Sequence, residues 1–163
     1  MTRRELKACS HIFVLVRAFQ QSSGDVLELG TGYFSTLLLH WMCMMTGRKL
    51  VSYDTVAKWA NYAKKMWVNK DHQIFFVEDL DSVDLCDRHW GLVLIDHAPY
   101  LRRQIDAIRL KDHADFLVLH DTEPREERRY GYPEVYKHFE HIYQDKRQTP
   151  WTAVVSNFKE FSP

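Results

Sequence analysis

The chain has 163 residues, of which 45% are hydrophobic and 13% aromatic, so it can bury the core of one compact domain spanning 1–163. Its 22 basic residues balance 22 acidic ones, and a formal net charge of zero gives no overall attraction to nucleic acid or to an anionic membrane, although it does not bear on local basic patches. Cys9, Cys43 and Cys86 form no C-x-x-C pair, so we expect no disulfide framework, no zinc site and a reducing, cytoplasmic location.

Hydrophobic periodicity predicts alternating helices and strands with short connections, which is the pattern of an α/β fold. A helix is expected over 3–21, in an N-terminal segment 1–22 that packs on the domain. Its apolar run 11–16 is far shorter than the roughly 20 residues that a membrane-spanning helix needs. The other expected elements are, in chain order, strand 25–30, helix 34–46, strand 49–54, helix 57–69, strand 73–78, a short helical or irregular stretch to 89, strand 91–96, helix 99–110, strand 115–120, a helix near 133–139, and strands 140–145 and 151–158.

The first strand runs into a turn with two glycines, and this segment predicts a loop that binds a nucleotide cofactor. Gly30 and Gly32 permit a positive φ and a close approach of the backbone to a ligand. A helix follows at once, and its first amides and positive dipole end would face that ligand. A dinucleotide fingerprint, G-x-G-x-x-G, would need glycine where Ser35 stands, so that fingerprint is incomplete.

Glu28, just ahead of this turn, suits the ammonium group of an amino-acid-like ligand, bound directly or through water. An acidic residue followed by x-G-x-G resembles the first motif of class I S-adenosylmethionine-dependent methyltransferases, which usually have a further glycine where this chain has Phe34. The resemblance covers nearly the whole chain and implies a Rossmann-like seven-stranded, mostly parallel sheet with helices on both faces and a C-terminal antiparallel strand pair. It also implies that S-adenosylmethionine is bound by Glu28, Gly30, Thr31, Gly32, Ser35, Asp54, Asp79 and Asp96.

Acidic residues end the second and third strands. Asp54 follows the glycine turn by about 20 residues, the spacing at which a carboxylate meets ribose hydroxyls, and it also suits the N-cap of the next helix. These two roles are compatible. In the family an acid near Asp79 binds the adenine amino group, with Glu78 as the next candidate, and a solvated turn acid is the alternative.

His–Asp pairs follow the fourth and fifth strands. Asp96-His97 and His120-Asp121 would place four titratable groups around one crevice, although strand alternation should turn one member of each pair into the packing. In one mechanism His97 or His120 is the general base that removes a proton from the methyl acceptor, and an adjacent carboxylate such as Asp121 fixes its tautomer.

In a second mechanism Asp96 and Asp121 bind Mg²⁺, which lowers the pKa of a substrate hydroxyl. The run Ile95-Asp96-His97 is similar to the Leu-Asp-His of catechol O-methyltransferase-like enzymes, which have an Asp-Asn pair in the region of Asp121-Thr122. Because a hydroxyl is a poorer magnesium ligand than an amide carbonyl, metal-free catalysis is favoured.

The segment 123–133 is charged, aromatic and bracketed by prolines, and we expect a loop that covers the site. Its arginines and tyrosines suit an acidic or planar substrate, and a solvated charge run is the alternative. Arg102 and Arg103 have the same two interpretations. The Trp and Met residues over 41–45 suggest packing on the sheet or on a second subunit of a homodimer.

Together these features predict methyl transfer from S-adenosylmethionine to an oxygen or nitrogen of a small-molecule acceptor. A nucleic-acid partner is not expected, because the chain has neither an appended substrate domain nor a basic balance. The alternatives are an NAD-linked oxidoreductase and a methyltransferase-like domain that serves only as a binding or interaction module.

Overall fold

The computed structural model describes residues 9–67 and 69–163 and contains a seven-stranded sheet with the order β3-β2-β1-β4-β5-β7-β6. The five strands β1 to β5 are parallel, and β7 pairs antiparallel with both β5 and β6. This confirms the predicted α/β sheet with its C-terminal antiparallel pair. The strands are β1 Val26–Leu29, β2 Leu50–Asp54, β3 His72–Phe76, β4 Trp90–Ile95, β5 Ala114–His120, β6 His141–Asp145 and β7 Thr152–Ser156.

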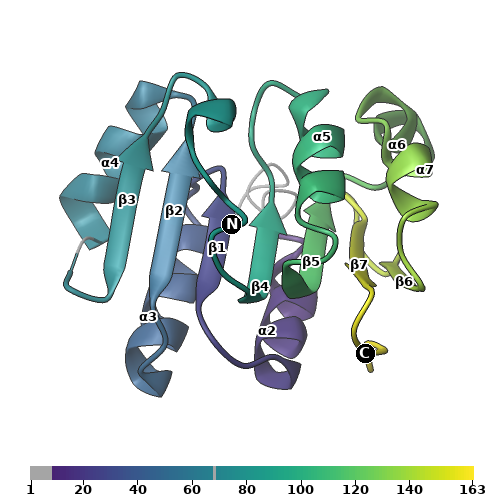
Figure 1. The fold of residues 1–163 in the computed structure, drawn as a ribbon, viewed down its shortest axis with the longest axis horizontal. Helices are drawn as coiled ribbons and strands as arrows, with labels where there is room; N and C mark the ends of the chain where they lie inside the picture. Colours follow the sequence, from purple (N-terminus) through teal and green to yellow (C-terminus); the bar gives the residue numbers. More distant parts are fainter. Residues whose placement is uncertain (1–8, 68) are drawn as a thin grey trace.

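Helices cover both faces of the sheet (Figure 1). One face carries α2 Ile12–Gln21, α3 Ser35–Thr46 and α4 Ala57–Trp67, and the other carries α5 Arg102–Arg109, α6 Pro124–Arg129 and α7 Tyr132–Tyr136. A short 3-10 helix, η1 Leu80–Ser82, lies in the connection between β3 and β4. The predicted N-terminal helix is seen as α2, and its predicted part over 3–8 lies outside the described residues. Within 9–67 and 69–163, no helix has the length and apolar character required to cross a membrane.

Strand alternation divides the core into two layers. Leu92 and Leu94 of β4 pack with α2 and α3, while Val93 and Ile95 pack on the side of α5 and α7. Every residue of β4 is buried, as expected for a central parallel strand that is covered on both faces.

The prediction of a loop over 123–133 was wrong. Pro124 occupies the first turn of α6, acidic residues Glu126 and Glu127 follow in that turn, and Arg128 and Arg129 lie in the last turn. Proline at the first helical position favours a helix. Acidic residues near the positive N-terminal end of the helix dipole and basic residues near its negative C-terminal end favour it too, so a helix begins at Pro124.

Candidate functional site

The register of the sheet brings the predicted strand-end residues to one edge. Leu29 of β1 is paired with Tyr53 of β2 and with Ile95 of β4, and Ile95 is paired with Leu119 of β5. The next residues along these strands, Gly30, Asp54, Asp96 and His120, are therefore neighbours. This is the carboxyl edge of the parallel strands, where ligands bind in open α/β sheets.

The two glycines of the turn after β1 meet different surroundings. Gly30 has a φ of +95°, and a Cβ atom on it would lie 2.5 Å from the carbonyl oxygen of Asp96, so the protein itself requires glycine there. A Cβ atom on Gly32 would meet, among the described residues, nothing nearer than Ser35 Oγ at 3.5 Å. The space beside Gly32 is therefore open to a ligand, and Ser35, the first residue of α3, borders it.

Asp54 holds this turn in place. Its Oδ2 accepts hydrogen bonds of 2.7 Å from both the backbone N–H and the hydroxyl of Thr31, and its Oδ1 accepts one of 2.8 Å from the N–H of Val56. The hydrogen bond from Val56, just ahead of α4, agrees with the helix-capping role that the sequence also predicts for Asp54. The ribose-binding role of Asp54 stays a prediction.

Glu28 is buried and is connected to the glycine turn by hydrogen bonds through Thr36. Its carboxylate accepts hydrogen bonds from Thr36 Oγ1 at 2.9 and 3.0 Å and from Ser52 Oγ at 2.7 Å, and Thr36 Oγ1 in turn accepts the N–H of Gly32 at 2.8 Å. Burial raises the pKa of Glu28 to about 7, although the hydrogen bonds of Ser52, Ser35 and Thr36 oppose this. Glu28 thus reaches the turn through Thr36, and its predicted contact with a ligand is untested.

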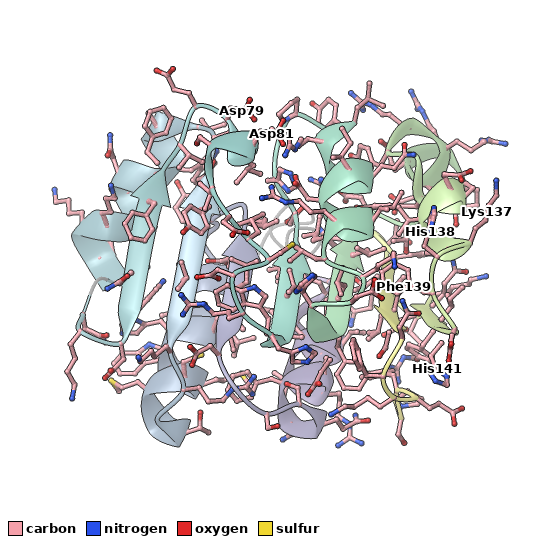
Figure 2. The ribbon with its side chains drawn as sticks, in the orientation of Figure 1. Asp79, Asp81, Lys137, His138, Phe139 and His141 are labelled. Atoms are coloured by element: carbon pink, nitrogen blue, oxygen red, sulfur yellow. The ribbon has the colours of Figure 1, made fainter. Side chains whose placement is uncertain are left out.

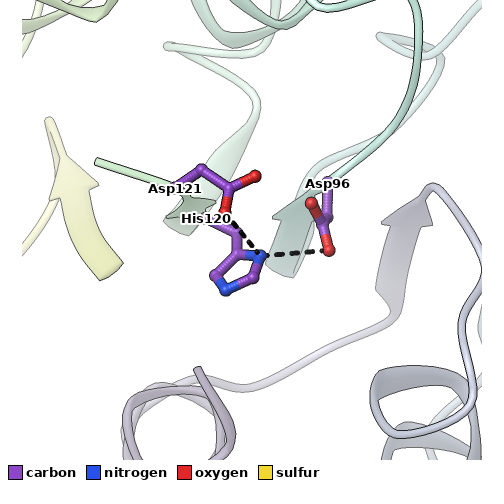
Figure 3. A group of neighbouring side chains, drawn as sticks. All are labelled: Asp96, His120 and Asp121. Carbon is purple, nitrogen blue, oxygen red and sulfur yellow. Dashed lines mark ion pairs between the residues drawn. The ribbon is translucent and has the colours of Figure 1, made fainter. Parts of the chain in front are cut away.

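A cluster of titratable groups lies at the ends of β4 and β5 (Figure 3). His120 Nδ1 is 3.2 Å from Asp96 Oδ2 and 3.7 Å from Asp121 Oδ1, while its Nε2 is 3.2 Å from Ser10 Oγ. Burial by itself would lower the pKa of His120, but Asp96 and Asp121 outweigh it and raise this pKa above its usual value. Burial opposes ionisation of Asp96 as well, yet His120 and Arg103 hold the pKa of Asp96 below its usual range.

Arg103 of α5 ties this cluster to the rest of the site. Its Nη2 is 2.8 Å from Asp96 Oδ1, its Nη1 is 3.2 Å from Asp121 Oδ2, and its Nε donates a hydrogen bond of 2.7 Å to the carbonyl oxygen of His97. Asp121 has a φ of +60°, an uncommon conformation for a residue other than glycine. The positive charge of the Arg103 guanidinium group therefore compensates the negative charges of two carboxylates. One of these belongs to Asp121, whose backbone is strained.

His97, the other predicted base, lies apart from this cluster. Its Nε2 is 3.0 Å from Asp106 Oδ2 of α5, and both side chains are fully buried. Asp106 also accepts hydrogen bonds from Arg102 at 2.9 and 3.0 Å. In the Asp96-His97 pair, His97 is thus the member that points into the packing.

Asp79 lies at the same edge of the sheet as the cluster, after β3 (Figure 2). Its carboxylate accepts the N–H of Asp81 at 2.9 Å and is 3.4 Å from Arg102 Nη1, and its side chain is exposed. A solvated turn acid is therefore what the structure shows, and its predicted contact with adenine is untested.

The donor atoms do not favour Mg²⁺. Asp96, His120 and Asp121 offer three ligand atoms within 4.8 Å of one another, but one of them is an imidazole nitrogen, whereas Mg²⁺ prefers an all-oxygen set. Arg103 already supplies positive charge to both carboxylates. Magnesium at Asp96 and Asp121 stays an untested prediction.

Comparisons with known proteins bear on the fold. The structure matches the N-terminal domain of human METTL16 in complex with SAH (S-adenosylhomocysteine), with a TM-score of 0.64 and 12% identity over 94% of this chain and 71% of that one. The fold is that of the class I methyltransferases. It also matches the human METTL16 catalytic domain in complex with the MAT2A 3′UTR hairpin 1, with a TM-score of 0.64 and 10% identity over 99% of this chain and 73% of that one.

A third similar structure is the human methyltransferase 10 domain containing protein, with a TM-score of 0.65 and 12% identity over 94% of this chain and 83% of that one. No protein-family model and no curated protein matches the sequence. The class I methyltransferase fold is thus established by shape alone, and the closer likeness to catechol O-methyltransferase-like enzymes stays a prediction.

Several residues of the site escaped the sequence interpretation. Ser10 reaches His120 only because α2 packs on the sheet, and Thr36 and Ser52 had no motif to mark them. The sequence leaves two interpretations open for Arg103, a substrate-binding residue of the site or a solvated charge on the surface. Its place four residues after the Pro99 of Asp96-His97-Ala98-Pro99, at the start of a helix, was the available signal.

Proposed function

We propose that the protein transfers a methyl group from S-adenosylmethionine to an oxygen or nitrogen atom of a small-molecule acceptor. The observation that carries this proposal is the contact between Gly30 and Asp96, because it joins the glycine turn to the titratable cluster at one sheet edge. The open space beside Gly32 fits a cofactor that approaches the backbone closely. S-Adenosylmethionine, when bound there, supplies an electrophilic methyl group on its sulfonium.

The chain's own residues divide the work of binding. The open space beside Gly32, bordered by the first residue of α3, would receive the donor, and Glu28 keeps the turn in shape through Thr36. Asp54 accepts hydrogen bonds from the ribose hydroxyls, and Asp79 accepts one from the adenine amino group. The proposed donor-binding residues are Glu28, Gly30, Thr31, Gly32, Ser35, Asp54, Asp79 and Asp96.

His120 is the proposed general base. Asp96 and Asp121 face its Nδ1 and favour the tautomer that carries a proton there, so that Nε2, which lies 3.2 Å from Ser10 Oγ, is the nitrogen that accepts one. While the acceptor atom would form its bond to the methyl carbon, the bond from that carbon to the sulfonium sulfur would break and S-adenosylhomocysteine would leave. The proton of the acceptor would then move to Nε2 of His120, beside the hydroxyl of Ser10. His97, which pairs with Asp106, then serves to position α5 and Arg103.

An RNA acceptor is the second candidate. It is supported by the structural match to a METTL16 domain that was determined with an RNA hairpin. The formal net charge of zero argues for the small molecule, because proteins that neutralise many phosphates carry a basic excess. An NAD-linked oxidoreductase gains no support from the structural matches, and a purely binding module does not require the His120 cluster.

A transfer assay with radiolabelled S-adenosylmethionine tests the proposal. The acceptors are a panel of small hydroxyl and amine compounds and, separately, RNA hairpins. We expect label in a small molecule with the wild type and with His138→Gln, a control at an exposed histidine, and a loss of at least about 100-fold with His120→Gln. Label in RNA alone would contradict the small-molecule acceptor, and full activity of His120→Gln would remove it as the base.

A further inference from the structure

A row of hydrogen-bonded side chains runs through the core from α3 toward the glycine turn. Nδ1 of His40, on α3, is 3.0 Å from Nδ1 of His72, and Nε2 of His72 is 3.0 Å from Ser52 Oγ. Ser52 in turn donates a hydrogen bond of 2.7 Å to the carboxylate of Glu28. We call these four residues the histidine–glutamate chain.

The register of the sheet aligns this chain. Glu28 of β1 is paired with Ser52 of β2, and His72, at the start of β3, is paired with Leu50. Because side chains two residues apart on a strand point to the same face, His72 and Ser52 share one face of the sheet. Exposure falls along the chain, from 8% for His40 to 2% for His72 and 0% for Ser52 and Glu28. His40 is therefore the end nearest to solvent.

The hydrogen bonds of the chain have a fixed direction when Glu28 is ionised. The one hydrogen of the Ser52 hydroxyl then goes to the carboxylate, so Nε2 of His72 must donate to Ser52 Oγ. A neutral His72 with its proton on Nε2 can only accept at Nδ1, so Nδ1 of His40 donates there.

The same contacts fit the opposite direction when Glu28 carries a proton. The conversion begins when a proton from solvent binds Nε2 of His40. The Nδ1 proton of His40 then moves to Nδ1 of His72, the Nε2 proton of His72 moves to Ser52 Oγ, and the Ser52 proton moves to the carboxylate. Glu28 gains one proton in total, and both histidines end neutral, each as its other tautomer.

Glu28 is the member of the chain that changes charge near pH 7. Burial, with a smaller contribution from Asp54 of β2, raises its pKa to about 7, although the hydrogen bond from Ser52 opposes this. Burial also raises the pKa of the Cys43 thiol, on α3, to about 12, so this neighbour stays neutral. On the other side β4 presents Leu94, which is paired with Glu28.

The two histidines are neutral near pH 7. Burial lowers the pKa of His40, and burial together with His40 lowers that of His72 to about 4, against a hydrogen bond to the Trp67 backbone. Within 9–67 and 69–163, α4 brings to these rings the indole of Trp67, 5.6 Å from His40 between ring centroids, rather than a charged side chain. A neutral imidazole can hold its proton on either nitrogen, as the two directions of the chain require.

We propose that the histidine–glutamate chain conducts protons between solvent and Glu28, and that donor binding at the glycine turn therefore depends on pH. The link to the turn is Thr36, which donates to Glu28 at 2.9 Å and accepts the N–H of Gly32 at 2.8 Å. The methyl donor and its product both carry an ammonium group, which an ionised Glu28 attracts more strongly than a neutral one. His72 is thus a positioning residue, and its effect on the donor rests on the proposed function.

Nitrogen NMR of histidine-labelled protein tests the proton path in the wild type, without a ligand. At about pH 8 we expect the protons on Nε2 of His72 and Nδ1 of His40, and at about pH 6 the other tautomer of both, with His72 still uncharged. Glu28→Gln, whose amide donates to Ser52 at either pH, should keep the low-pH tautomers throughout. His138→Gln, a control at an exposed histidine beside α7 (Figure 2), should behave as the wild type. An unchanged tautomer of His72 in the wild type would overturn the path.

Calorimetry with S-adenosylhomocysteine at the same two pH values tests the effect on the donor. The wild type and His138→Gln should bind at least about fivefold more tightly at the higher pH, and Glu28→Gln should lose this difference. Equal affinities of the wild type at both pH values would overturn the pH dependence. Absence of binding at either pH would instead refute the proposed donor site, and the NMR measurement would still decide the proton path.

Two substitutions of His72 test its role in the same calorimetry. His72→Phe leaves the Ser52 hydrogen without an acceptor when Glu28 is protonated, so the rise in affinity should move to lower pH. His72→Gln has an amide that can donate or accept and should restore the wild-type profile. Circular dichroism verifies that both variants are folded. Identical pH profiles of folded His72→Phe and the wild type would remove His72 from the path.

Discussion

Gly30 and Asp96 are in contact across the ends of β1 and β4: a single Cβ atom on Gly30 would come within 2.5 Å of the Asp96 carbonyl oxygen. The turn that precedes α3 and the residue that carries the His120 ion pair are therefore built against each other. A substitution at Gly30 is therefore expected to disturb Asp96 as well. For this reason, substitutions of the two glycines of the turn test the site directly.

Gly30→Ala should lower the free energy of unfolding by more than about 2 kcal/mol, because it adds a side chain at positive φ against fixed backbone atoms. Gly32→Ala meets no such obstacle and should change it by less than about 1 kcal/mol, while weakening S-adenosylhomocysteine binding at least about tenfold by filling the ligand's space. Urea unfolding and calorimetry measure the two effects. Wild-type affinity in Gly32→Ala would show that no ligand approaches this glycine.

Asp54→Ala should weaken S-adenosylhomocysteine binding at least about tenfold, on the order of 1.4 kcal/mol, because the ribose loses an acceptor and the turn loses its bonds to Thr31. Calorimetry on folded protein checks this. Asp71→Ala, at the opposite edge of the sheet, is the matched control and should bind normally. Equal affinities of the two variants would remove Asp54 from the site.

The His120 imidazole should titrate above pH 6.5 in the free protein, because Asp96 and Asp121 raise its pKa. In Asp96→Asn the pKa should fall. His11, whose pKa is lowered to about 3 by burial and by His120, should stay neutral over the same range. NMR titration of the histidines, with His120→Gln for assignment, measures these values, and a pKa of His120 that is insensitive to Asp96 would refute the pairing.

Glu28 should make stability depend on pH. Its pKa rises from 4.5 to about 7 on folding, so the folded state holds a proton that the unfolded chain loses. The stabilisation by this proton is complete below pH 4.5 and is lost as pH rises through about 7, for a total on the order of 3 kcal/mol. Glu28→Gln should lack this decline. Urea unfolding of both proteins from pH 5 to 8 compares them, and parallel curves would contradict a protonated Glu28.

Arg103→Met should lower the free energy of unfolding by about 2 to 4 kcal/mol, because it leaves Asp96 and Asp121 without their shared partner. Arg125→Met removes an arginine whose side chain is 92% exposed and should cost less than about 0.5 kcal/mol. Thermal and urea unfolding compare the two. Similar small losses in both would mean that Arg103 does not hold the cluster together.

The fold could be predicted because its signals are local. Apolar runs of strand length alternate with helical patterns, and the glycine turn marks the end of β1. Once the strands are parallel and adjacent, the residues that follow them must meet at one edge, which is why Asp54, Asp96 and His120 were foreseen together.

Contacts between distant segments could not be predicted in the same way. Alternation indicates which face of a strand Glu28 occupies, but not that Thr36 and Ser52 would bind it there. In the sequence, His97 and His120 are equal candidates for the general base. Only the structure shows that the imidazole of His97 pairs with Asp106, which lies on a helix. These partners depend on how helices pack on the sheet, which no short motif records.

Calorimetry with S-adenosylhomocysteine and NAD tests the central proposal most directly. The glycine turn, with its open space beside Gly32 and its acid at Asp54, is expected to bind S-adenosylhomocysteine with a dissociation constant in the micromolar range and to show no binding of NAD. Binding of NAD without S-adenosylhomocysteine, or of neither compound, would contradict a methyl-donor site at this edge of the sheet.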